Sequence, residues 1–175
     1  MKITRYKLFP VWQSEKEEQW LNRMAQQGHA LTGIGFCRYT FEECKPGEYQ
    51  IRIQLSEKKV QEKASQDYIR FLEDSGIEYV GNYCKWIYVR RQSKEETFEL
   101  FSDNQSKINQ INSILKFILP IIILNLFVGI WNIGMFLTNR RGVSLFGVIN
   151  LAIAFFGFFG CWSLYKKRTA LQKDS

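Results

Sequence analysis

Two uncharged, apolar runs near the C-terminus constrain this chain more than any other feature. Residues 117–139 and 142–165 contain no charged side chain. At a rise of about 1.5 Å per residue, each run would form a helix roughly 35 Å long, enough to cross a hydrocarbon core of about 30 Å. A core helix of a soluble protein would keep a polar stripe, but apolar residues at 121–124 and 126–128 occupy every face. The sequence therefore predicts two transmembrane helices.

The link between the runs, TNRRG, is so short that the helices would form a tight hairpin with both ends on one side. Basic residues favour the cytoplasmic side of membrane helices. The tip carries Arg140 and Arg141, whereas the other side carries Lys107, Lys116, Lys166, Lys167, Arg168 and Lys173. The first residues also lack the apolar core of a signal peptide. We therefore expect a multi-pass cell-membrane protein whose N-terminal part and C-terminus are cytoplasmic.

The charge distribution argues against nucleic-acid binding, although the net charge is +7. Residues 1–113 hold 17 Lys and Arg against 16 Asp and Glu, whereas residues 114–175 hold 7 against one. The basic excess therefore flanks the apolar runs, as in membrane anchors, and does not form a patch on the N-terminal part. The expected partners are the lipid bilayer and a second copy or another membrane protein, with no nucleic acid.

Three asparagines inside the apolar runs are the candidate interaction residues. Asn125, Asn132 and Asn150 are costly in lipid and should face a partner. Counting from the turn, Asn132 and Asn150 would lie at similar depth and could bond, with Gly129 and Gly147 allowing close approach. Asn125 would remain for a second copy. Helix packing is the favoured interpretation of these asparagines, and a substrate path through the membrane is the alternative.

The N-terminal part reads as a mixed α and β domain. Residues 14–28 predict a helix with a capping box of Ser14 and Glu17, an apolar stripe of Trp20, Leu21 and Met24, and Gly28 as terminator. Glu15, Glu17 and Glu18 would complement the helix dipole. Residues 64–76 predict a second helix, whose inner face would hold Ala64, Tyr68, Phe71, Leu72 and Ser75.

Strands are expected at residues 3–9, 31–41, 49–55, 77–83 and 85–91, the clearest being the alternating YQIRIQL. Pro46 and Gly47 would form a turn, and the glycines of TGIGF indicate a bulge or close packing rather than phosphate binding. The order βαββαβ, with the last strand interrupted or doubled near NYCK, predicts an α+β, ferredoxin-like domain with two helices on one face of a sheet. A two-helix transmembrane hairpin would follow it. No internal repeat is evident.

These patterns divide the chain into five parts: a soluble α+β domain at 1–101, a polar juxtamembrane linker or helix at 102–113, transmembrane helices at 114–138 and 143–165, and a basic cytoplasmic tail at 166–175. Ile108, Ile111 and Leu115 have helical spacing, so the linker should extend the first membrane helix.

The motif EEQWLNRMAQQGHAL resembles an E-x-W-L-x-x-M-A-x-x-G-x-x-L signature, and GEYQIRI and DYIRFLEDSGIEYVGNYCKWIYVRR follow it. Together these segments, within about residues 2–102, resemble the bacterial family catalogued as domain of unknown function 2812. That resemblance implies hydrophobic helices after the domain and an accessory protein under transcriptional control. It implies no catalytic residues.

The sequence contains no constellation of catalytic residues. His29 is the one histidine, more typical of an exposed turn than of a switch, and the four cysteines lack metal-ligand spacing. We expect no enzyme activity, no catalytic or metal site and no cofactor. The leading hypothesis is a membrane-anchored cytoplasmic sensing or protein-interaction domain. The alternative is a subunit of an export or immunity system in which the transmembrane hairpin is the functional part.

Overall fold

The computed structural model describes residues 2–56, 60–93, 104–139 and 144–173. The chain divides into two compact units, Met1–Ser102 and Asp103–Ser175. The predicted strand of residues 3–9 is shorter than expected, since β1 ends at Tyr6. Arg140 and Arg141 of the predicted hairpin tip lie outside the described residues.

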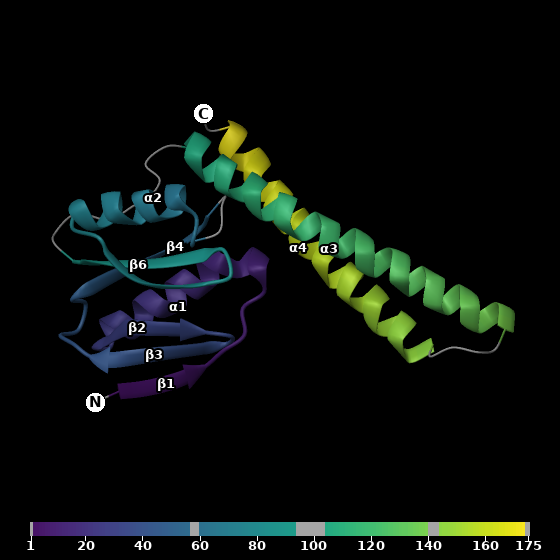
Figure 1. The fold of residues 1–175 in the computed structure, drawn as a ribbon, viewed down its shortest axis with the longest axis horizontal. Helices are drawn as coiled ribbons and strands as arrows, with labels where there is room; N and C mark the ends of the chain where they lie inside the picture. Colours follow the sequence, from purple (N-terminus) through teal and green to yellow (C-terminus); the bar gives the residue numbers. More distant parts are fainter. Residues whose placement is uncertain (1, 57–59, 94–103, 140–143, 174–175) are drawn as a thin grey trace. The chain divides into compact units, whose positions relative to one another are not determined.

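The N-terminal unit contains six strands and two α-helices among its described residues (Figure 1). In chain order they are β1 (Lys2–Tyr6), α1 (Ser14–Gln26), β2 (His29–Gly35), β3 (Arg38–Glu43), β4 (Tyr49–Leu55), α2 (Lys63–Asp74), β5 (Glu78–Tyr83) and β6 (Trp86–Gln92), with a short 3-10 turn at Val11–Gln13. The strands form two three-stranded sheets, in the orders β1-β3-β2 and β4-β6-β5. Every strand pair in them is antiparallel.

The mixed α+β class is confirmed, but the ferredoxin-like order is not. The segment expected to be one strand at residues 31–41 is a hairpin, β2 and β3, with its turn at Phe36 and Cys37. Cys37 adopts a left-handed backbone with φ of 52°, which is uncommon outside glycine and asparagine and therefore hard to predict from sequence. The additional strand gives two sheets instead of one.

The two halves of this unit are a structural repeat of the order β-α-β-β. Residues 48 apart occupy equivalent places: α1 ends before Gly28 and α2 before Gly76, both with positive φ. In both halves the last two strands change register at a glycine, Gly33 and Gly81. The bulge expected within TGIGF is thus present, while the repeat is invisible to simple inspection because few equivalent residues are identical.

Helix α1 lies between the two sheets (Figure 1). Leu21 is fully buried, and Trp20 packs edge-on against Tyr39 and Phe41 of β3, with ring centres 5.0 and 5.8 Å apart. The rings of Trp20 and Phe9 also lie in contact, at 5.7 Å. Of the predicted stripe of α1, Leu21 is therefore core, while Trp20 and Met24 are half-buried, and α1 has a sheet on either side.

Helix α2 covers the face of the second sheet opposite α1. Its buried cluster contains Val60, Ile69, Leu72, Ile77, Ile87 and Val89. The predicted inner face is correct at Leu72, but Ala64, Phe71 and Ser75 are exposed. Ser65 and Ile69 are buried in their place, because the helix packs along a stripe rotated by about one residue.

The predicted capping box is wrong. The 3-10 turn runs directly into α1, so Gln13 is the N-cap and makes no side-chain bond to the helix. Ser14 and Glu17 are both buried inside the unit. His29, expected in an exposed turn, begins β2 and is half-buried.

The second unit consists of α3 (Asn104–Asn139) and α4 (Ser144–Lys173), which pack against each other along much of their length. The structure confirms that the polar segment after residue 103 continues the first apolar helix. Helix α3 runs through Pro120 without a break. Both helices are long and apolar enough to cross a membrane.

Replacing Trp20 tests the core of the N-terminal unit. In a fragment ending at Ser102, Trp20→Ala should lower the free energy of unfolding by about 3–5 kcal/mol, because three aromatic contacts disappear. Phe71→Ala removes an aromatic ring that is 63% exposed and should cost under about 1 kcal/mol. Urea unfolding measures both; equal losses in the two variants would contradict this core.

Candidate functional site

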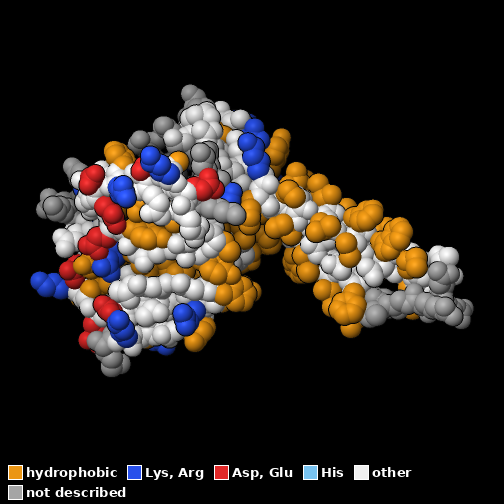
Figure 2. Space-filling model, in the orientation of Figure 1, with side chains coloured by type: hydrophobic (Ala, Val, Ile, Leu, Met, Phe, Trp, Pro, Cys, Tyr) orange, Lys and Arg blue, Asp and Glu red, His pale blue; other side chains and the backbone are white. Residues whose placement is uncertain are grey.

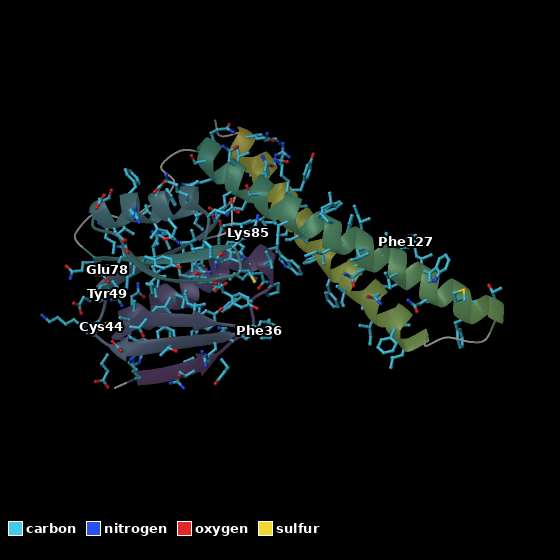
Figure 3. All side chains as sticks on the ribbon, viewed as in Figure 1. Phe36, Cys44, Tyr49, Glu78, Lys85 and Phe127 are labelled. Atoms are coloured by element: carbon cyan, nitrogen blue, oxygen red, sulfur yellow. The ribbon has the colours of Figure 1, made fainter. Side chains whose placement is uncertain are left out.

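Helices α3 and α4 display most of their apolar side chains outward. Only 22% of the apolar window of each helix is buried. Phe127, labelled in Figure 3, is 65% exposed and stands out from α3. A surface of this kind is far more apolar than the outside of ordinary soluble proteins.

Glycines bring α3 and α4 into close contact. A Cβ atom placed on Gly147 would lie 3.3 Å from the carbonyl oxygen of Gly129, and one on Gly157 would meet the side chain of Ile122 at 2.6 Å. By contrast, Gly134 has open space around it. The expected role of Gly129 and Gly147 in close approach is confirmed, and it corresponds to the small-residue packing of membrane helices.

The three candidate asparagines each bond within their own helix. The side-chain amides of Asn125, Asn132 and Asn150 donate to the carbonyl oxygens four residues earlier, each at 2.8 Å. The described residues include no bond between Asn132 and Asn150. A Cβ on Gly147 would instead lie 3.3 Å from the Cβ of Asn132, so the register differs by three residues from the predicted one. The glycine contacts set this register, and counting from the turn missed it.

A buried carboxylate joins the two sheets in the N-terminal unit. Glu17 Oε1 accepts hydrogen bonds from the hydroxyl of Tyr39 on β3, at 2.8 Å, and from that of Tyr88 on β6, at 2.6 Å. Burial raises the pKa of Glu17, against the opposing effect of the two hydrogen bonds. Burial also raises the pKa of both tyrosines, and the neighbouring Glu17 charge adds to it. Both hydroxyls therefore remain protonated donors.

Two further polar side chains of α1 bind the open edge of β4. The Asn22 amide donates to the Ile51 carbonyl and accepts from the Ile51 N–H, both at 2.9 Å. Glu18 accepts from the Ile53 N–H at 2.9 Å and lies 3.5 Å from Arg52. These side chains take the place of a neighbouring strand, which protects an edge that could pair with another chain.

Arg90 of β6 connects the sheets at one end of the unit. Its guanidinium donates to Glu78 at 2.7 Å and to the Leu31 carbonyl of β2 at 2.9 Å, and it lies 4.5 Å from the ring centre of Tyr49. Figure 3 shows Tyr49, Glu78 and Cys44 at this end. Burial raises the pKa of the Cys44 thiol, which makes it less reactive.

A shallow hollow of about 660 Å³ lies at the end of α2. It is lined by Glu73, Ser75, Gly76, Ile77, Glu78, Tyr79, Arg91 and Gln92. Its lining is mostly polar, whereas pockets for small organic ligands are mostly apolar. In the part of the chain that the structure describes, no group of three or more His, Cys, Asp or Glu could hold a metal ion, and the four cysteines form no disulfide.

A match to a family model shows the protein family to which the chain belongs. The model described as protein of unknown function (DUF2812) matches residues 13–123. The chain belongs to this family. The DUF2812 match extends from the start of α1 through β6 and into α3. Neither the curated proteins nor the solved structures gave a match.

The motif EEQWLNRMAQQGHAL lies within the residues that the DUF2812 model matches, and its side chains have structural roles. Glu18 binds the β4 edge, and Leu21, Ala25 and Leu31 are buried. Gly28 has φ of 84°, and a Cβ there would lie 3.0 Å from the Cys44 carbonyl oxygen. The motif therefore describes how α1 fits between the sheets and identifies no reaction.

The central role of Glu17 was missed from the sequence, where the three glutamates of α1 were assigned to the helix dipole. Of these three glutamates, only Glu15 is exposed. The available signal was spacing: Glu17 precedes Leu21 and Ala25 by four and eight residues, on the buried face. An acid on an apolar stripe predicts a buried partner.

The register of α3 and α4 can be tested by cross-linking. Asn132→Cys with Gly147→Cys should form a disulfide within one chain, since paired cysteines have Cβ atoms about 3.5–4.5 Å apart. Asn132→Cys with Asn150→Cys is the matched pair and should react much less. Both double-cysteine variants also carry Cys161→Ser, and mass spectrometry of oxidised membranes measures the disulfide formed in each. Preferential cross-linking of residues 132 and 150 would contradict the register.

The pH dependence of stability tests the buried carboxylate. The folded Glu17 keeps its proton to a higher pH than the unfolded one, whose pKa is about 4.5. Unfolding then releases a proton between the two values, so this group lowers the free energy of unfolding as the pH rises, by at most about 1.4 kcal/mol per unit.

Glu17→Gln can still accept both tyrosine hydrogen bonds and should remove this slope. Its free energy of unfolding, relative to the unmodified chain, should rise as the pH increases above 4.5. Chemical denaturation at a series of pH values measures the difference. Parallel pH profiles would show that Glu17 is ionised in the folded protein as readily as in the unfolded one.

Proposed function

We propose that this chain is a membrane-anchored, non-catalytic protein of the bacterial cell membrane. Helices α3 and α4 cross the bilayer as a hairpin, and the N-terminal unit acts in the cytoplasm as a sensing or protein-interaction domain. The observation that carries this proposal is the outward apolar surface of the helices, of which only 22% of each apolar window is buried. Water would not stabilise such a surface, whereas lipid would.

The orientation rests on the basic residues beside the helices. Lys107 and Lys116 precede the first apolar run, and Lys166, Lys167, Arg168 and Lys173 follow the second. They exceed the two arginines between the runs, and the more basic side is cytoplasmic. Both termini are therefore assigned to the cytoplasm.

The assignment as an interaction domain rests on how the polar groups of the N-terminal unit are used. Glu17, Glu18 and Arg90 are engaged in bonds that hold α1 and the two sheets together. Glu17 is only 8% exposed, which keeps substrates away from it. The family resemblance adds the expectation of an accessory protein under transcriptional control.

The alternative is a subunit of an export or immunity system in which the hairpin itself is functional. The close glycine contacts of Gly129, Gly147 and Gly157 favour it, because a passive anchor does not require them. Replacing the hairpin with an unrelated two-helix anchor distinguishes the proposals: partners captured by cross-linking in membranes persist under the first and disappear under the second.

Membrane fractionation tests the anchor. The full chain should stay in the membrane fraction after alkaline carbonate washing, because the hairpin would expose its apolar side chains to water if released. A fragment ending at Ser102 should move to the soluble fraction and remain folded by circular dichroism. Release of the full chain by carbonate would contradict the proposal.

A further inference from the structure

Four hydrophobic side chains protrude at one end of the N-terminal unit. Tyr6, Leu8, Phe36 and Tyr83 are 75%, 71%, 73% and 37% exposed. We call these four residues the tip surface. They come from the ends of β1 and β5, the segment that follows β1, and the β2–β3 turn.

The backbone holds the parts of the tip surface together. The N–H of Lys7 donates to the Cys37 carbonyl at 3.0 Å, which fixes the segment after β1 to the β2–β3 turn. The rings of Phe36 and Tyr83, from different sheets, lie 6.1 Å apart. Figure 3 places Phe36 and Lys85 at the same end of the sheets, away from Cys44, Tyr49 and Glu78.

The charges around the tip surface are mostly basic. Arg38 pairs with Tyr6 across the strands, and Lys85 lies in the β5–β6 turn. Arg5 and Lys7 adjoin Tyr6 in the sequence, and the Lys7 ammonium lies over the rings of Phe9 and Trp20. Glu15 and Glu62 lie at the starts of α1 and α2, toward this end. Glu17 and Glu18 follow Glu15 in α1, but both are bonded inside the unit. The opposite end carries Glu42, Glu43, Glu48, Glu73, Asp74 and Glu78. In Figure 2 hydrophobic side chains gather at the tip end, and most acidic ones lie toward the other.

We propose that the tip surface rests on the anionic lipid headgroups of the membrane, an inference that builds on the proposed anchoring by α3 and α4. Protruding aromatic and aliphatic side chains with basic neighbours are what interfacial membrane contacts use: the apolar groups enter the headgroup boundary and the cations meet lipid phosphates. A second copy is a poorer occupant, because a symmetric contact through this surface would bring the basic residues of both copies into one interface.

Fluorescence quenching in nanodiscs tests this contact with the full chain. The exposed Cys84 in the β5–β6 turn takes the probe after Cys37, Cys44 and Cys161 are replaced by Ser. The matched control carries Cys84→Ser and Asp74→Cys, which moves the probe to the opposite end. A third chain, with the probe at Phe127→Cys, reports insertion of the hairpin.

With phosphatidylglycerol present, nitroxides on the headgroups should quench the Cys84 probe severalfold more than the Asp74→Cys probe. The difference should shrink in phosphatidylcholine alone, and Leu8→Ser with Phe36→Ser should abolish it. Equal quenching at both ends, indifference to that double variant, or cross-linking of Cys84 between chains without lipid quenching would overturn the inference.

The insertion probe separates the two proposals. Quenching of Phe127→Cys by acyl-chain nitroxides without quenching at Cys84 overturns only the tip contact. No quenching at Phe127→Cys overturns the anchor and the tip contact together.

Discussion

The N-terminal unit depends on the way three polar side chains place α1 between two sheets. Glu17 binds one tyrosine from each sheet, and Glu18 and Asn22 bind the backbone of β4. A buried carboxylate is unfavourable unless it is hydrogen-bonded, so its two tyrosines must both be in place. Loss of one tyrosine hydroxyl would leave α1 attached to a single sheet through this carboxylate.

This arrangement also explains why the repeat is hard to see in the sequence. The two β-α-β-β halves share their helix-ending and bulge glycines, Gly28 with Gly76 and Gly33 with Gly81. Their helices have different surroundings: α1 meets a sheet on either side, while α2 covers one face and leaves Phe71 exposed. Equivalent side chains of α1 and α2 therefore pack against different neighbours and differ in type. The backbone conformations at the shared glycines are the same in both halves.

The sequence predicted features that follow from local chemistry. The alternating strand at residues 49–55, the glycine ends of both helices and the helical extension before the apolar run were confirmed. Features that depend on tertiary contacts were missed: the β2–β3 turn at a left-handed cysteine, the burial of Glu17, and the helix register set by Gly129 and Gly147. The residue pattern along one helix or strand does not specify which other helix or strand will pack against it.

In the topology proposed above, the hairpin crosses a bilayer and leaves the N-terminal unit in the cytoplasm. Membrane-impermeant maleimide labelling in intact cells tests it most directly, with Cys84 as the one remaining cysteine and a second chain in which Gly142→Cys replaces it. We expect Cys84 to react only after the membrane is permeabilised, whereas Gly142→Cys, between the two helices in sequence, should react in intact cells. Labelling of Cys84 in intact cells, with Gly142→Cys protected, would contradict it.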